Sequence, residues 1–338
     1  MSLNQKVSGL LERLSESATL AMARKSRELK EAGHAVISLS LGEPDFDTPD
    51  FIKDAAKEGI DENYTHYMPV NGYADFRESI SMKFKRDNNV AYSADQIVVS
   101  TGAKQSLANL ILAVVNPGDE VLLPAPYWVS YIEMVKMAGG TPVVVETSIE
   151  DDYKISASQL RENLNDKTRM LIFSSPCNPS GSVYSEAELR EWADVIKDFP
   201  NLIAVSDEIY EHINYTENHF SLASIDTIYG QTVTVNGVSK SFAMTGWRIG
   251  YIGAPLWISK ACNKLQGQFT SGASGISQRA AKAAVEADPS VADEMKAIFL
   301  TRRDLFVRLL SVIDGVEINQ RKGEFYMYPR AFHYTHLT

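Results

Sequence analysis

The stretch NGVSKSFAMTGWRIG, residues 236–250, follows a β-rich run and places a lysine and an arginine among small residues and glycines. The lysine is Lys240, and the arginine, Arg248, comes eight residues later. A lysine in such a segment is either solvated or able to condense with an aldehyde cofactor, and condensation requires a partly desolvated, neutral amine. We therefore interpret Lys240 as a Schiff-base lysine and Arg248 as the residue that binds an anionic group of the same cofactor.

The composition is that of an ordinary globular protein with an acidic balance. The chain has 338 residues, of which 44% are hydrophobic and 22% charged, so it is long enough for two domains with a large core. A net charge of −10 argues against nucleic acid or an anionic membrane surface as the main partner, because either partner calls for a basic face. A small-molecule substrate is therefore the better expectation.

Neither the cysteines nor the first residues indicate export. Cys177 and Cys262 are too few and too far apart in sequence to suggest a disulfide framework. Residues 1–33 lack a basic region followed by an apolar core and a small-residue cleavage site. The apolar run at 107–115 is too short to span a membrane. These features predict a cytoplasmic protein that has no membrane partner.

Short β-rich runs alternate with helical stretches through the middle of the chain. One such stretch, residues 185–199, begins with a capping-box pattern of Ser185 and Glu188. The alternation predicts an α/β fold with a mostly parallel seven-stranded sheet. The short connection through Lys240 allows the last strand to run antiparallel. The seven runs are 97–100, 121–123, 142–146, 169–174, 202–206, 232–235 and 249–253.

The two ends of the chain differ from the middle and suggest a second domain built from both termini. Helices are expected over 8–32 and 290–312. The run AVISLSLG (35–42) is strand-like, and VEINQ (316–320) and EFYMYPR (324–330) follow the second helix. We predict three parts: an N-terminal segment with part of a small domain, a large cofactor-binding domain, and the incomplete C-terminal part of the small domain. Their bounds are 1–48, 49–285 and 286–338.

Polar and aromatic residues follow several predicted strands, where ligands bind in parallel sheets. The turn at 101–106 offers free backbone N–H groups to a phosphate, although it also fits an ordinary turn into a helix. Trp128 could stack on a flat ring or belong to the core, and Asn178 could be a fixed donor or a turn residue. Asp207 and Tyr210 end another strand, where surface exposure is the alternative.

Together these strand ends fit one chemistry better than they fit separate structural roles. Pyridoxal phosphate needs a lysine for its aldehyde and an acid for its pyridinium nitrogen. It also needs donors for its phenolate oxygen, an aromatic face and a phosphate cradle. Each requirement has a candidate in this chain, so the sequence predicts pyridoxal 5'-phosphate as cofactor.

Seven blocks of the sequence also resemble a known family, the class I, fold-type I aminotransferases. They are most similar to the bacterial aspartate aminotransferase branch, and they occur in matching order from about residue 8 to about residue 329. The blocks are SLGEPDFDTP (40–49), YTHYMPVNGYADFRESI (64–80), STGAKQSLANL (100–110), GDEVLLPAPYWVSY (118–131), SSPCNPSG (174–181), VSDEIYEHINY (205–215) and the opening stretch.

The resemblance implies a catalytic role for residues that contact the cofactor ring. Lys240 would form the internal aldimine and then move the proton between the substrate α-carbon and the cofactor. Asp207 would keep the pyridine nitrogen protonated, and Tyr210 with Asn178 would bind the phenolic oxygen. Trp128 would cover the ring.

The resemblance also implies a phosphate site and a shared dimer interface. The turn residues Gly102, Ala103 and Lys104 would hold the phosphate together with Arg248. In the family a tyrosine of the neighbouring subunit reaches that phosphate, and Tyr67 matches it. A homodimer with shared active sites is therefore expected.

The substrate contacts are implied in the same way. Gly42 matches the glycine beside the substrate carboxylate, and Trp128 and Asn178 would also contact substrate. Lys104 would favour an acidic side chain, unless it is a first-turn lysine that points to water. Aspartate or glutamate with a 2-oxo acid is the preferred pair. Aromatic, alanine-type or sulfur amino acids, and prephenate as a further acceptor, stay open.

One departure from the family pattern concerns the C-terminus. Family members continue past GEFYMYPR into a strand whose arginine binds the substrate α-carboxylate, whereas the tail AFHYTHLT holds no arginine and Arg330 comes too early to match. Either the chain is truncated, or a natural short variant supplies the contact differently. We favour truncation, which predicts a surviving cofactor site with poor or absent transaminase activity.

Two further functions are open at this point. A carbon–sulfur β-lyase on the same cofactor framework would release ammonia and pyruvate from cystathionine-like substrates. A non-catalytic member would bind cofactor, or a partner protein, without turnover. Transamination remains the leading interpretation, because the matching blocks are those of the aminotransferases.

Overall fold

The core of the protein is a seven-stranded sheet in a computed structural model that describes residues 7–39, 42–216 and 218–331. Its strand order is β1-β7-β6-β5-β4-β2-β3, and only β7 runs antiparallel to its neighbours β1 and β6. The predicted sheet, including the antiparallel last strand, is confirmed. The strands are β1 (Ile97–Ser100), β2 (Glu120–Pro124), β3 (Thr141–Val145), β4 (Thr168–Ser174), β5 (Ile203–Asp207), β6 (Thr232–Gly237) and β7 (Gly250–Gly253).

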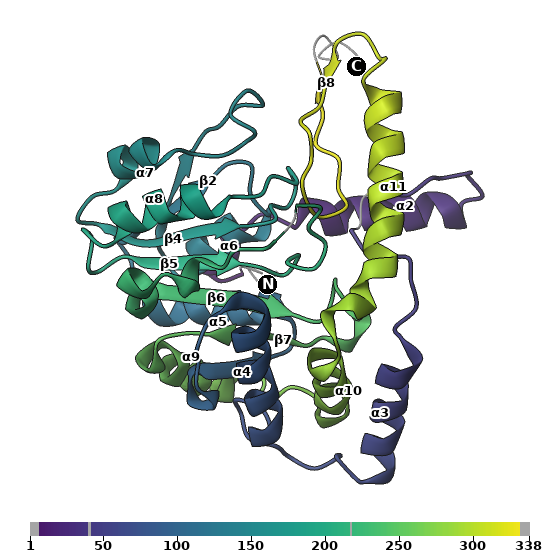
Figure 1. Cartoon of the computed structure of the whole chain (residues 1–338), viewed down its shortest axis with the longest axis vertical. Helices are drawn as coiled ribbons and strands as arrows, with labels where there is room; N and C mark the ends of the chain where they lie inside the picture. The colour runs from purple at the N-terminus through teal and green to yellow at the C-terminus, as the bar shows by residue number, and fades with distance from the viewer. Residues whose placement is uncertain (1–6, 40–41, 217, 332–338) are drawn as a thin grey trace, which may run out of the picture.

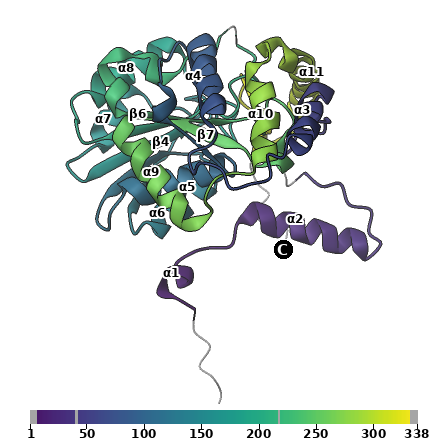
Figure 2. The same cartoon turned by 90° about the horizontal axis from the view of Figure 1, so that it is seen from below.

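Helices cover both faces of this sheet, which explains the apolar composition of its strands (Figures 1 and 2). Because side chains alternate along a strand, Met170 packs toward α5, α6 and α9, whereas Leu171 packs toward α7 and α8. A third cluster joins α4 and α10 to β1 and β7. These helices are α4 (Ala74–Asn88), α5 (Ala103–Val114), α6 (Ser130–Met137), α7 (Ala157–Asn163), α8 (Glu186–Ile196), α9 (Leu256–Phe269) and α10 (Gly275–Glu286).

Helix α8 begins as its sequence predicts. The Ser185 hydroxyl accepts a hydrogen bond from the Glu188 amide, and the Glu188 carboxylate accepts one from the Ser185 amide. The helix ends at Ile196, and turns continue the chain to Pro200, so the predicted end at 199 was three residues too late.

The N-terminal segment differs from its prediction. The helix expected over 8–32 is two helices, α1 (Gly9–Glu12) and α2 (Ala18–Glu31), neither of which has a buried residue. Helix α1 projects away from the body of the protein, whereas α2 begins beside it, with Thr19 and Leu20 at the cavity described below (Figure 2). The strand expected over 35–42 is wrong at its described positions, 35–39 and 42, where the backbone has no strand pairing and Ile37 is exposed. Residues 40 and 41 lie outside the described part.

The C-terminal segment is helical first and then irregular. Helix α11 (Asp293–Leu310) is preceded by a 3-10 turn, so the predicted helix over 290–312 is largely confirmed. The following strands are only two residues each, β8 (Val316–Glu317) and β9 (Arg330–Ala331). Within residues 324–330, Arg330 alone belongs to a strand. The rest turns at Glu324, whose φ of 52° is left-handed.

Further helices complete the fold. Helix α3 (Asp50–Asp61) packs along α10, and α11 meets the segment after β5 through Met295 and Phe299. The 3-10 helices are η1 (Ala94–Gln96), η2 (Leu222–Ser224), η3 (Asp226–Gln231), η4 (Thr245–Trp247) and η5 (Pro289–Ala292). Within the described residues, no helix has both the length and the apolar character needed to cross a membrane. The three-part domain division stays a prediction.

Candidate active site

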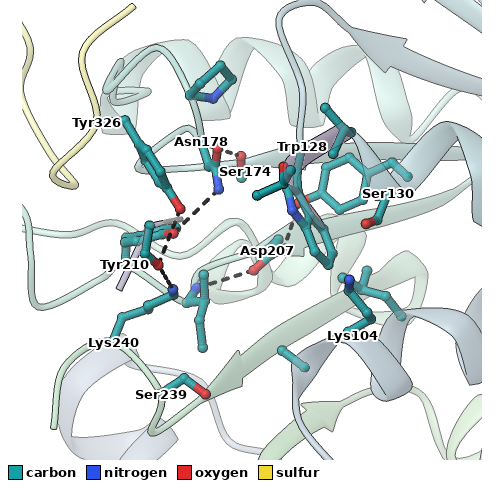
Figure 3. Close-up of a pocket in the computed structure, with 18 of the residues that line it drawn as sticks. Lys104, Trp128, Ser130, Ser174, Asn178, Asp207, Tyr210, Ser239, Lys240 and Tyr326 are labelled. Atoms are coloured by element: carbon teal, nitrogen blue, oxygen red, sulfur yellow. Dashed lines mark hydrogen bonds between the residues drawn. The ribbon is translucent and has the colours of Figure 1, made fainter. Parts of the chain in front are cut away.

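A cavity of about 440 Å³ lies at the carboxyl ends of the sheet strands and collects most of the predicted site residues (Figure 3). Ser174 and Asp207 end the paired strands β4 and β5 and face it together. Tyr210 and Lys240 follow β5 and β6 and lie on one side, and Lys104 lies on the other (Figure 3). The predicted residues that line it are Gly42, Ala103, Lys104, Trp128, Asn178, Asp207, Tyr210, Lys240 and Arg248.

Lys240 presents a largely buried amine to this cavity. Its Nζ donates to the Gly42 carbonyl at 2.6 Å. Burial lowers the pKa of Lys240 to about 8, and the nearby Arg248 lowers it further, while Glu43 and Asp207 oppose the shift. A substantial fraction of the amine is therefore neutral near pH 8, as a nucleophilic lysine requires.

Asp207 is a buried carboxylate at the end of β5. Its Oδ2 accepts from the Tyr131 hydroxyl at 2.7 Å, and its Oδ1 accepts from the Ile209 amide at 3.3 Å. Burial raises the pKa of Asp207 to about 6, against the lowering effect of these two donors. Among the described residues no lysine, arginine or histidine lies within ion-pair distance of it. The site therefore holds an acid whose natural counter-ion would be a cationic ligand group.

Tyr210 and Asn178 form a donor pair beside Lys240. Asn178 Nδ2 donates to the Tyr210 hydroxyl oxygen at 3.4 Å. The backbone N–H of Asn178 donates to Ser174 Oγ at 3.3 Å. Burial raises the pKa of Tyr210 well above its ordinary value, so its hydroxyl keeps its proton. Both side chains can donate to one acceptor in the cavity.

The opposite end of the cavity is the N-terminus of α5, where Gly102 is the N-cap residue with a φ of 83°. A Cβ on Gly102 would lie 2.1 Å from Arg248 Nη2, so only glycine lets this guanidinium approach the helix end. Position 250 also requires glycine, because a Cβ added there would lie 2.1 Å from the backbone nitrogen of Ala103. Free amides and a guanidinium together suit a phosphate.

Lys104 and Trp128 face each other across this end. Lys104 Nζ lies 4.9 Å from the Trp128 ring centroid, a cation–π geometry. Burial, followed by the charge of Arg248, lowers the pKa of Lys104. Lys104 lines the cavity although its side chain is exposed to solvent, so its assigned contact with the substrate stays a prediction.

Two predicted residues, Gly42 and Tyr67, lie in opposite surroundings, one in the cavity and one fully exposed. Gly42 lines the cavity, and a Cβ there would lie 1.6 Å from the Tyr326 hydroxyl oxygen, so any larger residue would displace the Tyr326 ring; its contact with the substrate carboxylate stays a prediction. Tyr67 is fully exposed and does not line the cavity of its own chain, so its assigned role stays a prediction that requires a second subunit. Arg330, which the sequence placed too early for the carboxylate contact, binds Glu150 and Glu317 instead.

Sequence reasoning missed several cavity residues. Tyr326 closes one side, with its hydroxyl 3.5 Å from the Gly42 carbonyl oxygen, although its segment was considered only as part of the small domain. Tyr131 contacts Asp207 from the first turn of α6, and Trp128 precedes that helix, so no helical spacing in the sequence indicated the contact. Ser174, Ser239 and Glu43 were also overlooked.

The fold and site define an α/β enzyme class built around a lysine after β6, an acid at the end of β5 and an anion site at the α5 N-terminus. Pyridoxal phosphate fits these residues, because the donors and charges of the cavity complement its phosphate, phenolic oxygen and ring nitrogen. Two cationic side chains that line the cavity, Lys104 and Arg248, lie at the α5 end and would offset the charge of a phosphate.

Comparison with known proteins gives the family. Residues 34–335 match the family of class I and II aminotransferases, and the chain belongs to it. It is 48% identical over 316 residues to a bifunctional aspartate aminotransferase and glutamate/aspartate-prephenate aminotransferase of Petunia hybrida. That match covers 92% of this chain and 66% of the petunia protein. A probable aspartate/prephenate aminotransferase of Rhizobium leguminosarum is 45% identical, over 94% of this chain and 80% of that protein.

A solved structure confirms the fold. The aspartate aminotransferase of Thermus thermophilus with maleate superposes with a TM-score of 0.92 at 37% identity, over 96% of this chain and 85% of that one. The fold is that of a fold-type I aminotransferase, and the chain is assigned to the aminotransferases. This family uses pyridoxal phosphate for transamination, which agrees with the donors of the cavity.

Proposed function

We propose that the protein is a pyridoxal-phosphate-dependent aminotransferase that exchanges an amino group between aspartate or glutamate and a 2-oxo acid. The observation that carries this proposal is the pairing of a desolvated amine, Lys240, with an uncompensated buried carboxylate, Asp207, in one cavity. Perturbed groups of opposite chemistry in one cleft are typical of an active site.

The cavity residues divide among the parts of the cofactor. The amides at the start of α5, in residues 102–104, and the Arg248 guanidinium would hold the phosphate. Asp207 would bind the ring nitrogen, Tyr210 and Asn178 the phenolic oxygen, and Trp128 the ring face. When bound, the cofactor supplies an aldehyde that condenses with amines and a ring that accepts the electron pair released at the substrate α-carbon.

The chemical work of the chain falls on Lys240. Its amine, with a pKa of about 8, is suited to take a proton from the substrate α-carbon and to return it at the neighbouring position. Asp207 stabilises positive charge on the ring, and Tyr210 keeps a donor directed at the phenolic oxygen. The cavity walls, including Tyr326 against Gly42, limit the entry of water.

The proposed dicarboxylic preference rests on Lys104. Its ammonium lies over Trp128 inside the cavity, where it can bind the distal carboxylate of aspartate. The names of the petunia and Rhizobium relatives include aspartate, and the Thermus structure is described with maleate, a dicarboxylate. Prephenate, which both relatives' names include, is a further candidate acceptor.

We also propose a cytoplasmic homodimer with shared sites. Tyr67 is fully exposed, and exposed apolar side chains at Leu20, Met22 and Ile37 mark the N-terminal segment as a surface that another subunit would cover. Mixing a Tyr67→Ala variant with a Lys240→Ala variant tests this arrangement. If sites are shared, the hybrid dimers regain activity that neither variant has alone. Lack of recovery in verified hybrids would contradict it.

The decisive experiment is an absorbance titration of the purified protein, loaded with pyridoxal phosphate, against aspartate alone. Transamination predicts conversion of the cofactor to its pyridoxamine form with release of oxaloacetate. Elimination with release of ammonia and no pyridoxamine form would favour the β-lyase instead. Borohydride trapping should place the cofactor on Lys240 and spare the exposed Lys260, and absence of any adduct would contradict the proposal.

A further inference from the structure

Tyr131 lies directly beneath the proposed cofactor site, although nothing in the assigned chemistry uses it. It is on the first turn of α6 and is 1% exposed. Its hydroxyl donates to Asp207 Oδ2 at 2.7 Å, the shorter of the two hydrogen bonds that the described residues make to this carboxylate. A short bond of this kind to an ionised acceptor is among the stronger hydrogen bonds in proteins.

The protonation states of the two groups decide which of them donates. Burial raises the pKa of Tyr131 well above that of free tyrosine, so the phenol stays protonated and the carboxylate accepts. The Tyr131 ring also meets the Trp128 ring edge to face, with centroids 5.5 Å apart. One side chain thus contacts both the acid and the aromatic cover of the cavity that Figure 3 shows.

We propose that Tyr131 is a positioning residue: its hydroxyl holds Asp207 ionised and oriented, so that the proton shared with the cofactor's ring nitrogen stays on the nitrogen. The inference rests on the proposed function, which assigns Asp207 to that nitrogen. Its physical basis is the competition between burial, which favours a protonated carboxyl, and a donated hydrogen bond, which favours the carboxylate. Without the hydroxyl, burial prevails and the shared proton moves toward Asp207.

The test uses pyridoxal phosphate labelled with ¹⁵N in the ring, bound to the full chain, and reads the ¹⁵N resonance at pH 7. Free cofactor at low and high pH gives the protonated and unprotonated reference positions. The unsubstituted protein should give the protonated position. Tyr131→Phe should shift the resonance toward the unprotonated position, because the phenyl ring fills the same space without donating.

Tyr92→Phe is the matched control. Tyr92 is also buried, at 2% exposed, but its hydroxyl bonds to Thr234 at 3.2 Å, away from the cavity lining. This variant loses a comparable buried hydroxyl, so it should keep the unsubstituted resonance position. A shift of equal size in both variants would show a general packing effect and would overturn the inference.

A second variant keeps the inference testable if Tyr131→Phe folds poorly. Site-specific 3-fluorotyrosine at position 131 retains the hydroxyl, and its ¹⁹F resonance should shift when Asp207→Asn is added, because the acceptor changes. An unchanged ¹⁹F resonance would overturn the inference.

The ¹⁵N outcomes separate this inference from the proposed function. If the unsubstituted protein shows a protonated ring and a well-folded Tyr131→Phe variant shows the same, only the role of Tyr131 fails. If the unsubstituted protein itself shows an unprotonated ring, the assignment of Asp207 fails, and the inference fails with it.

Discussion

Two consecutive residues, Asp207 and Glu208, are both buried carboxylates, yet their surroundings are opposite. Asp207 faces the cavity and accepts hydrogen bonds from one hydroxyl and one amide. Glu208 is 0% exposed and accepts from Ser206 at 2.9 Å and Ser221 at 2.8 Å, with His219 Nε2 at 2.9 Å from its other oxygen. Among the described residues, Asp207 therefore has no cation beside it, whereas both oxygens of Glu208 have hydrogen-bond partners.

Glu211 extends this second environment, which we call the Glu208–Glu211 cluster (Lys83, Asn88, Glu208, Glu211, His219 and Asn236). Glu211 bonds to Lys83 Nζ, to Asn88 Nδ2 at 2.6 Å and to Asn236 Nδ2 at 2.8 Å. The charges of Lys83 and the neighbouring histidines hold the pKa of Glu211 far below its usual range despite burial. Ligand atoms of Glu208, Glu211 and His219 lie close enough to hold a metal, but hydrogen-bond donors already occupy the carboxylate oxygens.

The contrast separates structural from functional burial of charge. A buried charge with a full set of partners fixes local structure, and loss of one partner is costly. A buried charge without a counter-ion raises the free energy of the empty protein and is retained where a ligand supplies the missing charge. Substitutions of the charged residue in the two environments should therefore have opposite effects on the stability of the empty protein.

The largest effect is expected for Lys240→Ala in the cavity. Removing the amine removes the proton carrier, and general acid–base catalysis alone contributes about 10² to 10⁴-fold. The half-reaction with aspartate, followed by absorbance, should slow by at least that factor, while the thermal midpoint stays the same or rises. Lys260→Ala, an exposed lysine on α9, should leave both unchanged. Activity near that of the unsubstituted protein would contradict the role of Lys240.

The next largest effect is expected in the Glu208–Glu211 cluster. Lys83→Met leaves Glu211 buried without its ammonium, and breaking a buried pair costs about 3–5 kcal/mol of unfolding free energy. Urea denaturation measures the loss. The double variant Lys83→Met/Glu211→Met should recover more than half of it, because no unpaired glutamate remains. A loss below about 1 kcal/mol would show that the cluster is dispensable.

Asp207→Asn should behave in the opposite way. Folding raises the pKa of Asp207 from about 3.9 in the unfolded chain to about 6. The carboxyl therefore favours the folded state below about pH 4 and loses that contribution as pH rises through 6. Above pH 6 its charge costs the empty protein about 3 kcal/mol. Asn removes this charge, although its NH₂ group lacks a partner.

We therefore expect the empty Asp207→Asn protein to gain about 1–2 kcal/mol of unfolding free energy at pH 8 and to bind pyridoxal phosphate more weakly. Glu211→Gln makes the same chemical change in the saturated cluster and should lower stability instead. If both variants shift stability in the same direction, the contrast between the two environments is wrong.

Much of the cavity could be predicted from the sequence, for a reason that particular residues illustrate. Asp207 ends the apolar strand β5, and Asn178 comes four residues after the end of β4. Parallel strands bring their carboxyl ends to one edge, so sequence position places these two residues at the same edge. Lys240 follows β6 in the same way. The glycines Gly42 and Gly102 came from the family resemblance, and the structure shows that a Cβ at either would collide with a cavity residue.

The remaining features depend on contacts between distant residues. Tyr131 is 76 positions from Asp207, and Lys83 is 128 positions from Glu211, so no local pattern reveals either pair. The strand expected over 35–42 was wrong because its alternating pattern found no partner strand in the described part of the chain. Tyr326 enters the cavity because Glu324 turns the backbone with a φ of 52°, which hydrophobic periodicity cannot show.

The smallest predicted effect concerns the pH dependence of Lys240. With a pKa of about 8, lowered mainly by burial, its amine is protonated at low pH and neutral at high pH. The neutral fraction is roughly 10% at pH 7 and roughly 90% at pH 9, a change of about ninefold. The rate at which the empty protein condenses with pyridoxal phosphate, measured by stopped-flow absorbance, should rise by that factor and level off above pH 9.

The plateau distinguishes Lys240 from other lysines. A fully solvated lysine in a model peptide has a pKa near 10.4, so the labelling rate of such an amine should keep rising well beyond pH 9. The lowered pKa also means that the unfolded chain binds more protons between about pH 8 and pH 10.4, so this group alone makes stability rise with pH in that window. A condensation rate that rises steadily to pH 11 would show that Lys240 is solvated, which would place it outside the uncompensated environment of Asp207.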